Sequence, residues 1–296
     1  MRNLFRAEWL KIAGNRWVAG CLVWIFPFLA VAAVVILAAI LALSSVARQG
    51  FREDEGNLWT EQAVGVWNIP NNPVGRLLLL GFAGVVFAGE YQWQTWKNVV
   101  PRNRRAALIA IKFIALGAFV VMAFVLMSIL WAAGGWLLAQ IADSSYGPKI
   151  SGEVLSDFAG DYALAASLAF TSTIIAAGYA ALAGMFTRSI LGGVLVGFAA
   201  TFLENLSILG LLLIGWLLDI PKIVHLYRLT PGYNLINVAS WINDNAPNRM
   251  QPSEEGAFST IVFADSLTFS VVTLALWVLG LIALTAFLFR RQDITS

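Results

Sequence analysis

The chain has 296 residues, of which 59% are hydrophobic and only 12% are charged. Soluble domains contain about 45–50% apolar and about 25% charged residues, so this composition excludes a soluble globular enzyme, a disordered protein and a coiled coil. A net charge of +2 and a single cysteine leave no basic nucleic-acid-binding domain and no disulfide framework within the chain. The apolar residues form long continuous runs, which predicts an all-α integral membrane protein.

Six apolar runs between charged residues are predicted to cross the membrane, which requires about 20 residues per helix. The first run is longer than the apolar core of a signal peptide, which has about 7–15 residues. The second is the weakest and has Arg76 near one end, and the fifth is interrupted by Glu204. In chain order the predicted spans are 17–43, 74–89, 113–141, 162–187, 189–218 and 266–289.

The distribution of charge predicts the sidedness of the chain. Basic residues concentrate before the first span, in the 90–112 loop, at Arg188 and after the last span, whereas the other connections are richer in Asp and Glu. Because cytoplasmic segments carry the excess of Lys and Arg, both termini and the 90–112 loop are predicted to be cytoplasmic. Arg76 is expected to extend to the outer surface. The predicted outer loops are 44–73, 142–161 and 219–265.

The N-terminal 16 residues have helical periodicity, with Phe5, Trp9 and Ile12 on one face and basic residues elsewhere. This pattern predicts an amphipathic helix that lies at the anionic inner surface of the membrane. A short disordered basic tail is the alternative.

A second periodic segment, 233–243, lies in the last outer loop. It predicts a short amphipathic helix at the outer interface, and a solvated loop is the alternative. Its expected apolar face consists of Leu235, Val238, Ala239 and Ile242, with Asn234, Asn237 and Asn243 on other faces.

The cytoplasmic 90–112 loop carries the most informative pattern. Glu90 closes the second span, an apolar and aromatic stretch follows, and Pro101 ends that stretch before a basic run. This order predicts a small exposed helix whose Trp96 and Val99 would dock in the groove of a partner protein. The basic run would suit an acidic rim on that partner or anionic lipid.

With these features the sequence resembles the membrane subunits of ABC exporters of the ABC-2 type. Those permeases begin with a basic amphipathic segment that contains a Glu-x-Leu-Lys-like run. After the second span they have a Glu, a Gly-Thr pair, a Pro, a basic residue and then a Lys that enters the third span; here Gln94 takes the place of the Gly. They end the sixth span with a basic pair and an acid. The corresponding residues of this chain are Glu8-Trp9-Leu10-Lys11, Glu90, Thr95, Pro101, Arg105, Lys112, Arg290, Arg291 and Asp293.

The resemblance implies a permease with six transmembrane helices, an N-terminal interfacial helix and a cytoplasmic coupling helix at about 92–103. The coupling helix would sit in a cleft of an ATP-binding subunit and transmit its closure. Two such subunits, which bind ATP and Mg, would work with this chain and a second permease, identical or related, to export an amphipathic cargo (a peptide, drug or lipid) across the cell membrane. The residues implied in coupling are Glu90, Thr95, Trp96, Lys97, Val99, Pro101, Arg104 and Arg105, although positive-inside topology alone would also explain the arginines.

The chain itself is not expected to be catalytic. It contains no Gly-x-x-x-x-Gly-Lys-[Ser/Thr] run, so ATP hydrolysis would take place in a partner subunit. It also lacks a His-Glu-x-x-His run and a Cys/His cluster, so no metal or cofactor site is expected in it. The single histidine, His225, is expected to be an ordinary loop residue.

Glu204, with Asn205 beside it, places an acid inside an apolar span. A central Asp, Lys or Arg costs about 2.5–3.5 kcal/mol on insertion scales, so Glu204 should face the bundle or a wet cavity. It would either line a cargo path or act as a structural carboxylate bonded to a neighbouring helix. Gly193 and Gly197 permit close helix approach, either within the bundle or at a dimer seam.

Two other functions are alternatives to an ATP-driven exporter. An ion-coupled secondary transporter would use Glu204, but it would also need charged pairs in the membrane or broken inverted repeats, which the sequence does not display. A membrane scaffold without transport activity is the second alternative. A neighbouring gene for an ATP-binding subunit would separate these functions.

Overall fold

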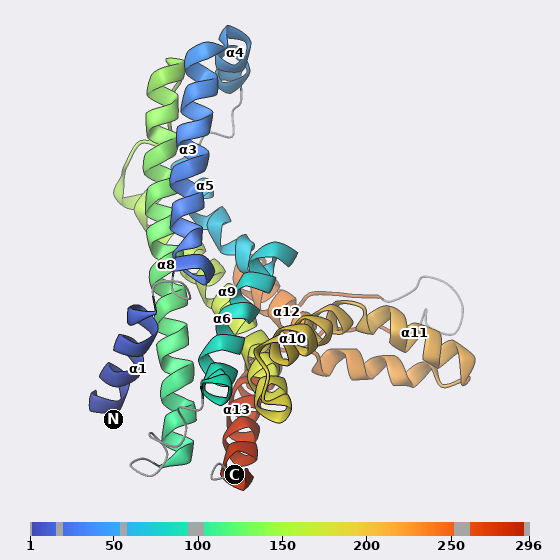
Figure 1. The fold of residues 1–296 in the computed structure, drawn as a ribbon. Helices are drawn as coiled ribbons and strands as arrows, with labels where there is room; N and C mark the ends of the chain where they lie inside the picture. Colours follow the sequence, from blue (N-terminus) through green and yellow to red (C-terminus); the bar gives the residue numbers. More distant parts are fainter. Residues whose placement is uncertain (1, 16–19, 54–57, 94–103, 252–260, 293–296) are drawn as a thin grey trace. The chain divides into compact units, whose positions relative to one another are not determined.

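The computed structural model describes residues 2–15, 20–53, 58–93, 104–251 and 261–292, and these residues form helices with only two isolated β-bridges. The elements are α1 (Arg2–Gly14), α3 (Ile25–Leu43), α4 (Ser45–Glu53), α5 (Trp59–Gly65), η1 (Val66–Asn71), α6 (Pro73–Gln92), α8 (Arg105–Ala142), α9 (Gly152–Thr187), α10 (Ile190–Asn205), α11 (Ser207–Leu217), η3 (Pro221–Leu229), α12 (Pro231–Asn243) and α13 (Leu267–Arg291) (Figure 1).

Five of these helices, α3, α6, α8, α9 and α13, are long and apolar enough to cross a membrane. α10 and α11 pass the same test as a pair, although they are bent by 62° at the break between them. These findings confirm the prediction of an all-α membrane protein. The fifth predicted span, 189–218, is therefore two helices, and Glu204 lies in the last turn of the first of them.

Several helices extend beyond the apolar runs that the sequence displays. α8 begins at Arg105 and α9 begins at Gly152, so both start before the apolar runs predicted as spans. The extension of α9 carries Glu153 in its first turn, where a carboxylate stabilises the positive end of the helix dipole. A hydropathy pattern marks the part of a helix suited to lipid, whereas backbone hydrogen bonding continues through polar turns.

The chain divides into two compact units. The first comprises Met1–Phe82 and Ile114–Phe170, and the second comprises Ala83–Phe113 and Thr171–Ser296. The boundaries fall within α6, α8 and α9, so these three helices contribute residues to both units.

Aromatic packing holds the first unit together. Phe124 of α8 contacts Phe26 of α3 and Trp67 of η1, with ring centroids 4.7 and 5.6 Å apart. Trp9 of α1 stacks on Phe119 of α8 with a centroid distance of 4.3 Å. Such pairs add to the free energy gained from apolar burial.

α1 has the amphipathic character that the sequence predicts. Its inward face contains the half-buried Phe5 and Trp9 and the buried Ile12, which is 5% exposed. The same face also buries Glu8, which accepts a hydrogen bond from Lys11 at 3.1 Å. The predicted position of this helix at the membrane surface remains a prediction.

Arg76 differs from its predicted environment. Arg76 is only 5% exposed, so its side chain does not extend to a free surface. Its Nη2 donates to the Asn71 side-chain oxygen at 2.5 Å, and Asn71 ends the 3-10 helix that precedes α6. The expectation was wrong because a nearby amide provides the acceptor that water would otherwise supply.

Small residues bring the helices of the second unit close together. A Cβ added at Gly178 of α9 would lie 2.9 Å from Leu281 of α13, and one added at Gly184 would lie 3.1 Å from Ala88 of α6. Close backbone approach of this kind is typical of helix packing in membranes.

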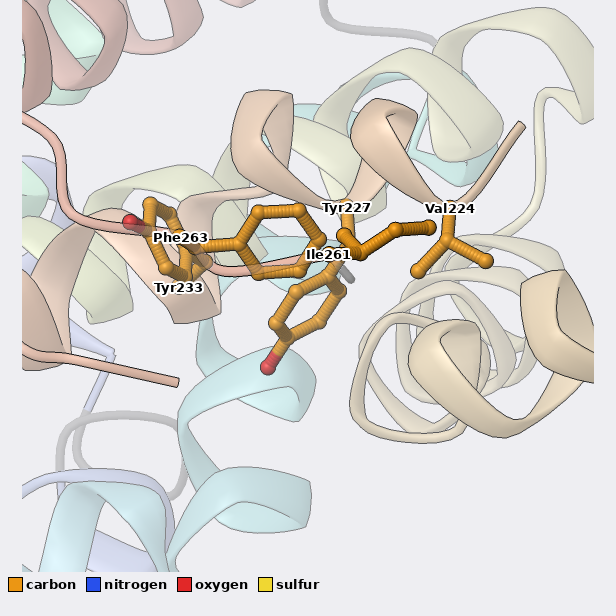
Figure 2. Close-up of a cluster of buried hydrophobic side chains, with 5 residues drawn as sticks. All are labelled: Val224, Tyr227, Tyr233, Ile261 and Phe263. Carbon is orange, nitrogen blue, oxygen red and sulfur yellow. The ribbon is translucent and has the colours of Figure 1, made fainter. Parts of the chain in front are cut away.

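The segment between α11 and α13 forms its own apolar cluster in the second unit. Figure 2 shows that this cluster takes side chains from η3, α12 and the strand-like residues before α13. Tyr233 is fully buried, and its ring lies edge-on to those of Tyr227 and Phe263. The members are Val224, Tyr227, Tyr233, Ile261 and Phe263.

α12 confirms the predicted helix, but the side of it that is buried is not the apolar face expected from the periodicity. Asn234 and Asn237, expected on other faces, are fully buried, whereas Ile242 is 56% exposed. The amide of Asn234 donates to the carbonyls of Arg228 and Thr230 at 2.8 and 2.7 Å. Hydrogen bonding therefore compensates the burial of amide groups that periodicity alone assigns to water.

Candidate coupling site

The two ends of the predicted coupling loop are well defined by the structure. α6 ends at Gln92 and α8 begins at Arg105. Five predicted coupling residues lie between these ends and outside the described residues: Thr95, Trp96, Lys97, Val99 and Pro101. The geometry of the site is therefore the geometry of the residues that anchor the loop.

Glu90 and Lys112 form a buried ion pair behind the loop. The Lys112 Nζ atom lies 2.5 Å from Glu90 Oε1 and donates a second hydrogen bond to the Val86 carbonyl at 2.8 Å. The two side chains are 0% and 1% exposed. This pair joins the last turns of α6 to the third turn of α8. The two charges depend on each other, because removing either one would leave the other buried without its counterion.

Arg105 binds the C-terminal end of α13. Its Nη1 atom donates to the carbonyls of Phe289, Arg290 and Gln292 at 3.1, 3.0 and 2.8 Å. The guanidinium also lies 5.8 Å from the centre of the Phe289 ring. The last carbonyls of a helix have no partners within the helix and carry partial negative charge, so a cation is favourable at this position.

Tyr91 and Gln292 complete the connection between α6, α9 and α13. The Tyr91 hydroxyl donates to the side-chain oxygen of Gln292. The amide nitrogen of Gln292 donates to the Met185 carbonyl of α9 at 2.8 Å. We call Glu90, Tyr91, Arg105, Lys112 and Gln292 the coupling frame.

Arg104 and Arg105 are neighbours in sequence with different surroundings. The Arg104 side chain is exposed and forms no ion pair or hydrogen bond with the part of the chain that the structure describes. Arg105 instead satisfies three carbonyls. Of these two predicted coupling residues, only the Arg104 side chain is without a partner among the described residues.

The arrangement links the ends of several helices through hydrogen bonds and one buried ion pair. Among the described residues, no group of three or more His, Cys, Asp or Glu side chains could hold a metal ion. His225 is exposed and packs its ring against Phe263 with a centroid distance of 5.6 Å. The coupling frame joins four helices, α6, α8, α9 and α13, at the two ends of one loop.

A sequence model of the family described as "ABC-2 family transporter protein" matches residues 4–202, about two thirds of the chain. The chain belongs to this ABC-2 transporter family. A comparison with curated proteins finds no significant match. The match confirms the family resemblance, and it includes most of α1, the complete 90–112 loop and most of α10.

The ABC-2 permease family is a membrane transport component and not a catalytic subunit. The family works in general with ATP-binding subunits, in which ATP and Mg act. Glu204, η3, α12 and α13 lie beyond the matched residues, so their roles must be argued from the geometry alone.

Glu204 of the permease joins three helices at the bend between α10 and α11. Its Oε1 accepts a hydrogen bond from the Gly232 N–H at 2.7 Å, and its Oε2 accepts one from the Tyr179 hydroxyl at 3.3 Å. Gly232 lies in the first turn of α12, where Thr230 also caps the helix. A carboxylate at a helix N-terminus is electrostatically favourable, which supports the structural alternative for Glu204. Asn205 beside it is exposed.

Gly193 and Gly197 are both buried in α10. A Cβ added at Gly193 would lie 2.8 Å from the Ala180 carbonyl and 3.2 Å from the Gly184 Cα, both in α9. The structure therefore places Gly193 at a helix crossing within the chain. This packing within the chain is enough to explain a glycine at position 193, without a contact to a second permease.

A polar network around Asp265 was not found from the sequence. The Asp265 carboxylate is paired with Arg228 of η3 and accepts a hydrogen bond from the Tyr233 hydroxyl at 2.9 Å. Its carbonyl accepts from Asn237 at 3.0 Å and from the Trp241 indole at 2.8 Å. The bond to Arg228 holds the pKa of Asp265 below its usual value, although burial opposes this shift.

Two kinds of signal could have found the residues that sequence reasoning missed. Tyr91 and Gln292 each adjoin a residue of the family pattern, Glu90 and Arg291. Arg228 and Asp265 are 37 residues apart and opposite in charge within or beside one loop. Neither signal specifies a partner, because contacts of such separation depend on the fold.

Proposed function

We propose that this chain is the membrane subunit of an ATP-driven ABC exporter that moves an amphipathic cargo, a peptide, drug or lipid. The family match over residues 4–202 carries the proposal, because it includes the loop expected to contact an ATP-binding subunit. Two such subunits and a second permease, identical or related, would complete the transporter in the cell membrane. Both termini of the chain would be cytoplasmic.

In this proposal the 90–112 loop is a coupling loop with two kinds of residue. Residues 94–103 and the exposed Arg104 contact the ATP-binding subunit. The coupling frame supports the proposal because it would pass a displacement of the loop to α6, α8, α9 and α13. A loop anchored by a buried ion pair and three carbonyl bonds moves with the helices that hold it.

The same geometry disfavours the ion-coupled alternative. A proton-coupled transporter would need an acid that is free to exchange protons and cargo. The Glu204 carboxylate is instead engaged by Gly232 and Tyr179 at a helix N-terminus. We assign Glu204 a structural role at the bend between α10 and α11.

Co-purification of the chain with the products of its neighbouring genes in mild detergent tests the proposal. We expect a stoichiometric ATP-binding protein whose ATPase activity responds to the permease. Trp96→Ala in the loop should abolish this response, and Trp136→Ala, at a Trp that is 55% exposed in α8, is the matched control.

A chain that purifies without an ATP-binding protein and moves solute down an ion gradient would refute the proposal. Equal ATPase responses in both tryptophan variants, with an ATP-binding partner present, would instead refute the assigned coupling role of the loop.

A further inference from the structure

We infer that α13 energetically links two polar networks at its opposite ends, so that loosening one network loosens the other. One network is the coupling frame. The other is the η3–α12 cap, which we define as residues 221–243 together with 261–265. The significance of this link for transport rests on the proposed function, but the link itself is a property of this chain.

At the C-terminal end of α13, four carbonyl or amide groups bind residues outside the helix. Arg105 takes the carbonyls of Phe289, Arg290 and Gln292, and the Gln292 side chain bonds both Tyr91 and the Met185 carbonyl. Phe289 is fully buried beneath the guanidinium. A displacement of Arg105 therefore cannot leave the end of α13 unchanged.

At the N-terminal end of α13, the η3–α12 cap is bonded to the helix at several points. Asn237 donates to the Ser270 hydroxyl at 2.8 Å, and the Trp277 indole donates to the Leu229 carbonyl at 2.7 Å. The Arg228 guanidinium, paired with Asp265, lies 5.4 Å from the centre of the Phe269 ring. The cap thus contacts the first three turns of α13.

The helix between these ends is suited to act as one rigid body. It has 25 residues and no proline, and at 1.5 Å per residue it is about 37 Å long. Leu281 rests against Gly178 of α9, and Trp277 packs edge-on against Tyr179 at 6.0 Å. Because all of these contacts lie in the second compact unit, the link does not depend on the arrangement of the two units.

Hydrogen exchange of the full chain in lipid nanodiscs, without an ATP-binding subunit, tests the inference. Coupling between distant sites is commonly worth about 0.5–2 kcal/mol, which corresponds to a change of about 2- to 30-fold in exchange rate. Arg105→Ala should raise exchange by this factor in α12 and in residues 261–266. Arg104→Ala is the matched control and should leave both segments unchanged, because the Arg104 side chain is exposed.

The reverse experiment also measures hydrogen-exchange rates. Since coupling free energies are reciprocal, Trp277→Phe, which removes one indole donor at the cap, should raise exchange in the first turns of α8 and at the end of α13. Trp277→Phe keeps an aromatic ring at this position, although a smaller one, and it avoids the risk that a charge deletion prevents folding.

Purely local effects in both directions would overturn the inference. So would an equal rise for Arg104→Ala and Arg105→Ala. If Arg105→Ala raised hydrogen exchange throughout both units, the test would rest on Trp277→Phe alone. Unchanged exchange in the first turns of α8 of that variant would then overturn the link. None of these outcomes depends on finding an ATP-binding partner, so failure here is distinguishable from failure of the proposed function.

Discussion

The ion pair between Glu90 and Lys112 is the most deeply buried charge pair among the described residues. A buried ion pair adds little net stability relative to apolar residues of the same volume. Replacing only one partner is destabilising, because it leaves the other charge buried without a counterion. Its position at the root of the 90–112 loop suggests that the pair specifies how α6 and α8 meet.

Substitutions at this pair should show that asymmetry. Glu90→Gln or Lys112→Met should each destabilise the protein by about 3–5 kcal/mol, because each leaves one buried charge. The combined change Glu90→Leu with Lys112→Met should recover most of the loss. Thermal unfolding followed by size-exclusion chromatography in detergent measures the effect, with Lys149→Met at an exposed lysine as the control. Single variants as stable as the wild type would contradict this role.

Asp265 should make the stability of the η3–α12 cap dependent on acid. Its pKa is lowered in the folded protein, first of all by Arg228. A carboxyl group with a depressed pKa stabilises the fold at pH values above its unfolded pKa, and the contribution is lost as pH falls through the folded pKa. The stability difference between the wild type and Asp265→Asn should therefore still be present at about pH 5 and be lost only below about pH 4. A difference that shrinks near pH 6 would refute the assignment.

At the scale of helices, small residues set the approach of α9, α10 and α13. Gly184 and Gly193 meet at the crossing of α9 and α10, and Gly178 receives Leu281 of α13. The sequence predicted such a role for Gly193 from its spacing to Gly197, because the pattern is local. It could not predict that α9 would be the neighbour, since this depends on packing between distant segments.

A pair of glycine substitutions tests the crossing. Gly193→Ala should lower the unfolding temperature, because its Cβ would lie 2.8 Å from a backbone carbonyl that cannot easily move. Gly280→Ala in α13 should leave the temperature unchanged or raise it, because no atom lies within 4 Å of the added Cβ and alanine favours helix over glycine. Equal effects in thermal unfolding would show that the crossing is loosely packed.

The buried asparagines of α12 illustrate what local pattern cannot supply. Periodicity places Asn234 and Asn237 on faces other than the apolar face. That placement would keep them out of the core if α12 packed only through apolar side chains. Asn237 is buried because Asp265 and Ser270, about thirty residues later, provide its acceptors. Arg76 follows the same rule, since Asn71 takes the place of water.

For the whole molecule, composition was sufficient to predict an all-α membrane protein, and the long apolar helices confirm it. The family was recognisable because its pattern consists of short local motifs along the chain. The coupling frame was only partly predictable. Glu90, Arg105 and Lys112 belong to the pattern, whereas Tyr91 and Gln292 gain their importance from a contact across 201 residues.

The sidedness predicted from basic residues can be measured directly. In a Cys21→Ser background, Asp157→Cys should react with a membrane-impermeant maleimide in intact cells, because residue 157 is exposed and lies in the predicted outer loop 142–161. Arg104→Cys should react only after permeabilisation. The opposite labelling pattern would invert the predicted topology, and labelling of both in intact cells would refute the six-span assignment.

The bonds from Arg105 to the carbonyls at the end of α13 can form only late in synthesis of the chain. Arg105 leaves the ribosome long before residues 289–292 exist, so the base of the 90–112 loop is incomplete while most of the chain is being inserted. Only the last helix supplies the missing acceptors. A chain that ends before α13 therefore lacks these acceptors for Arg105, and the contact can form only after the last helix has been synthesised.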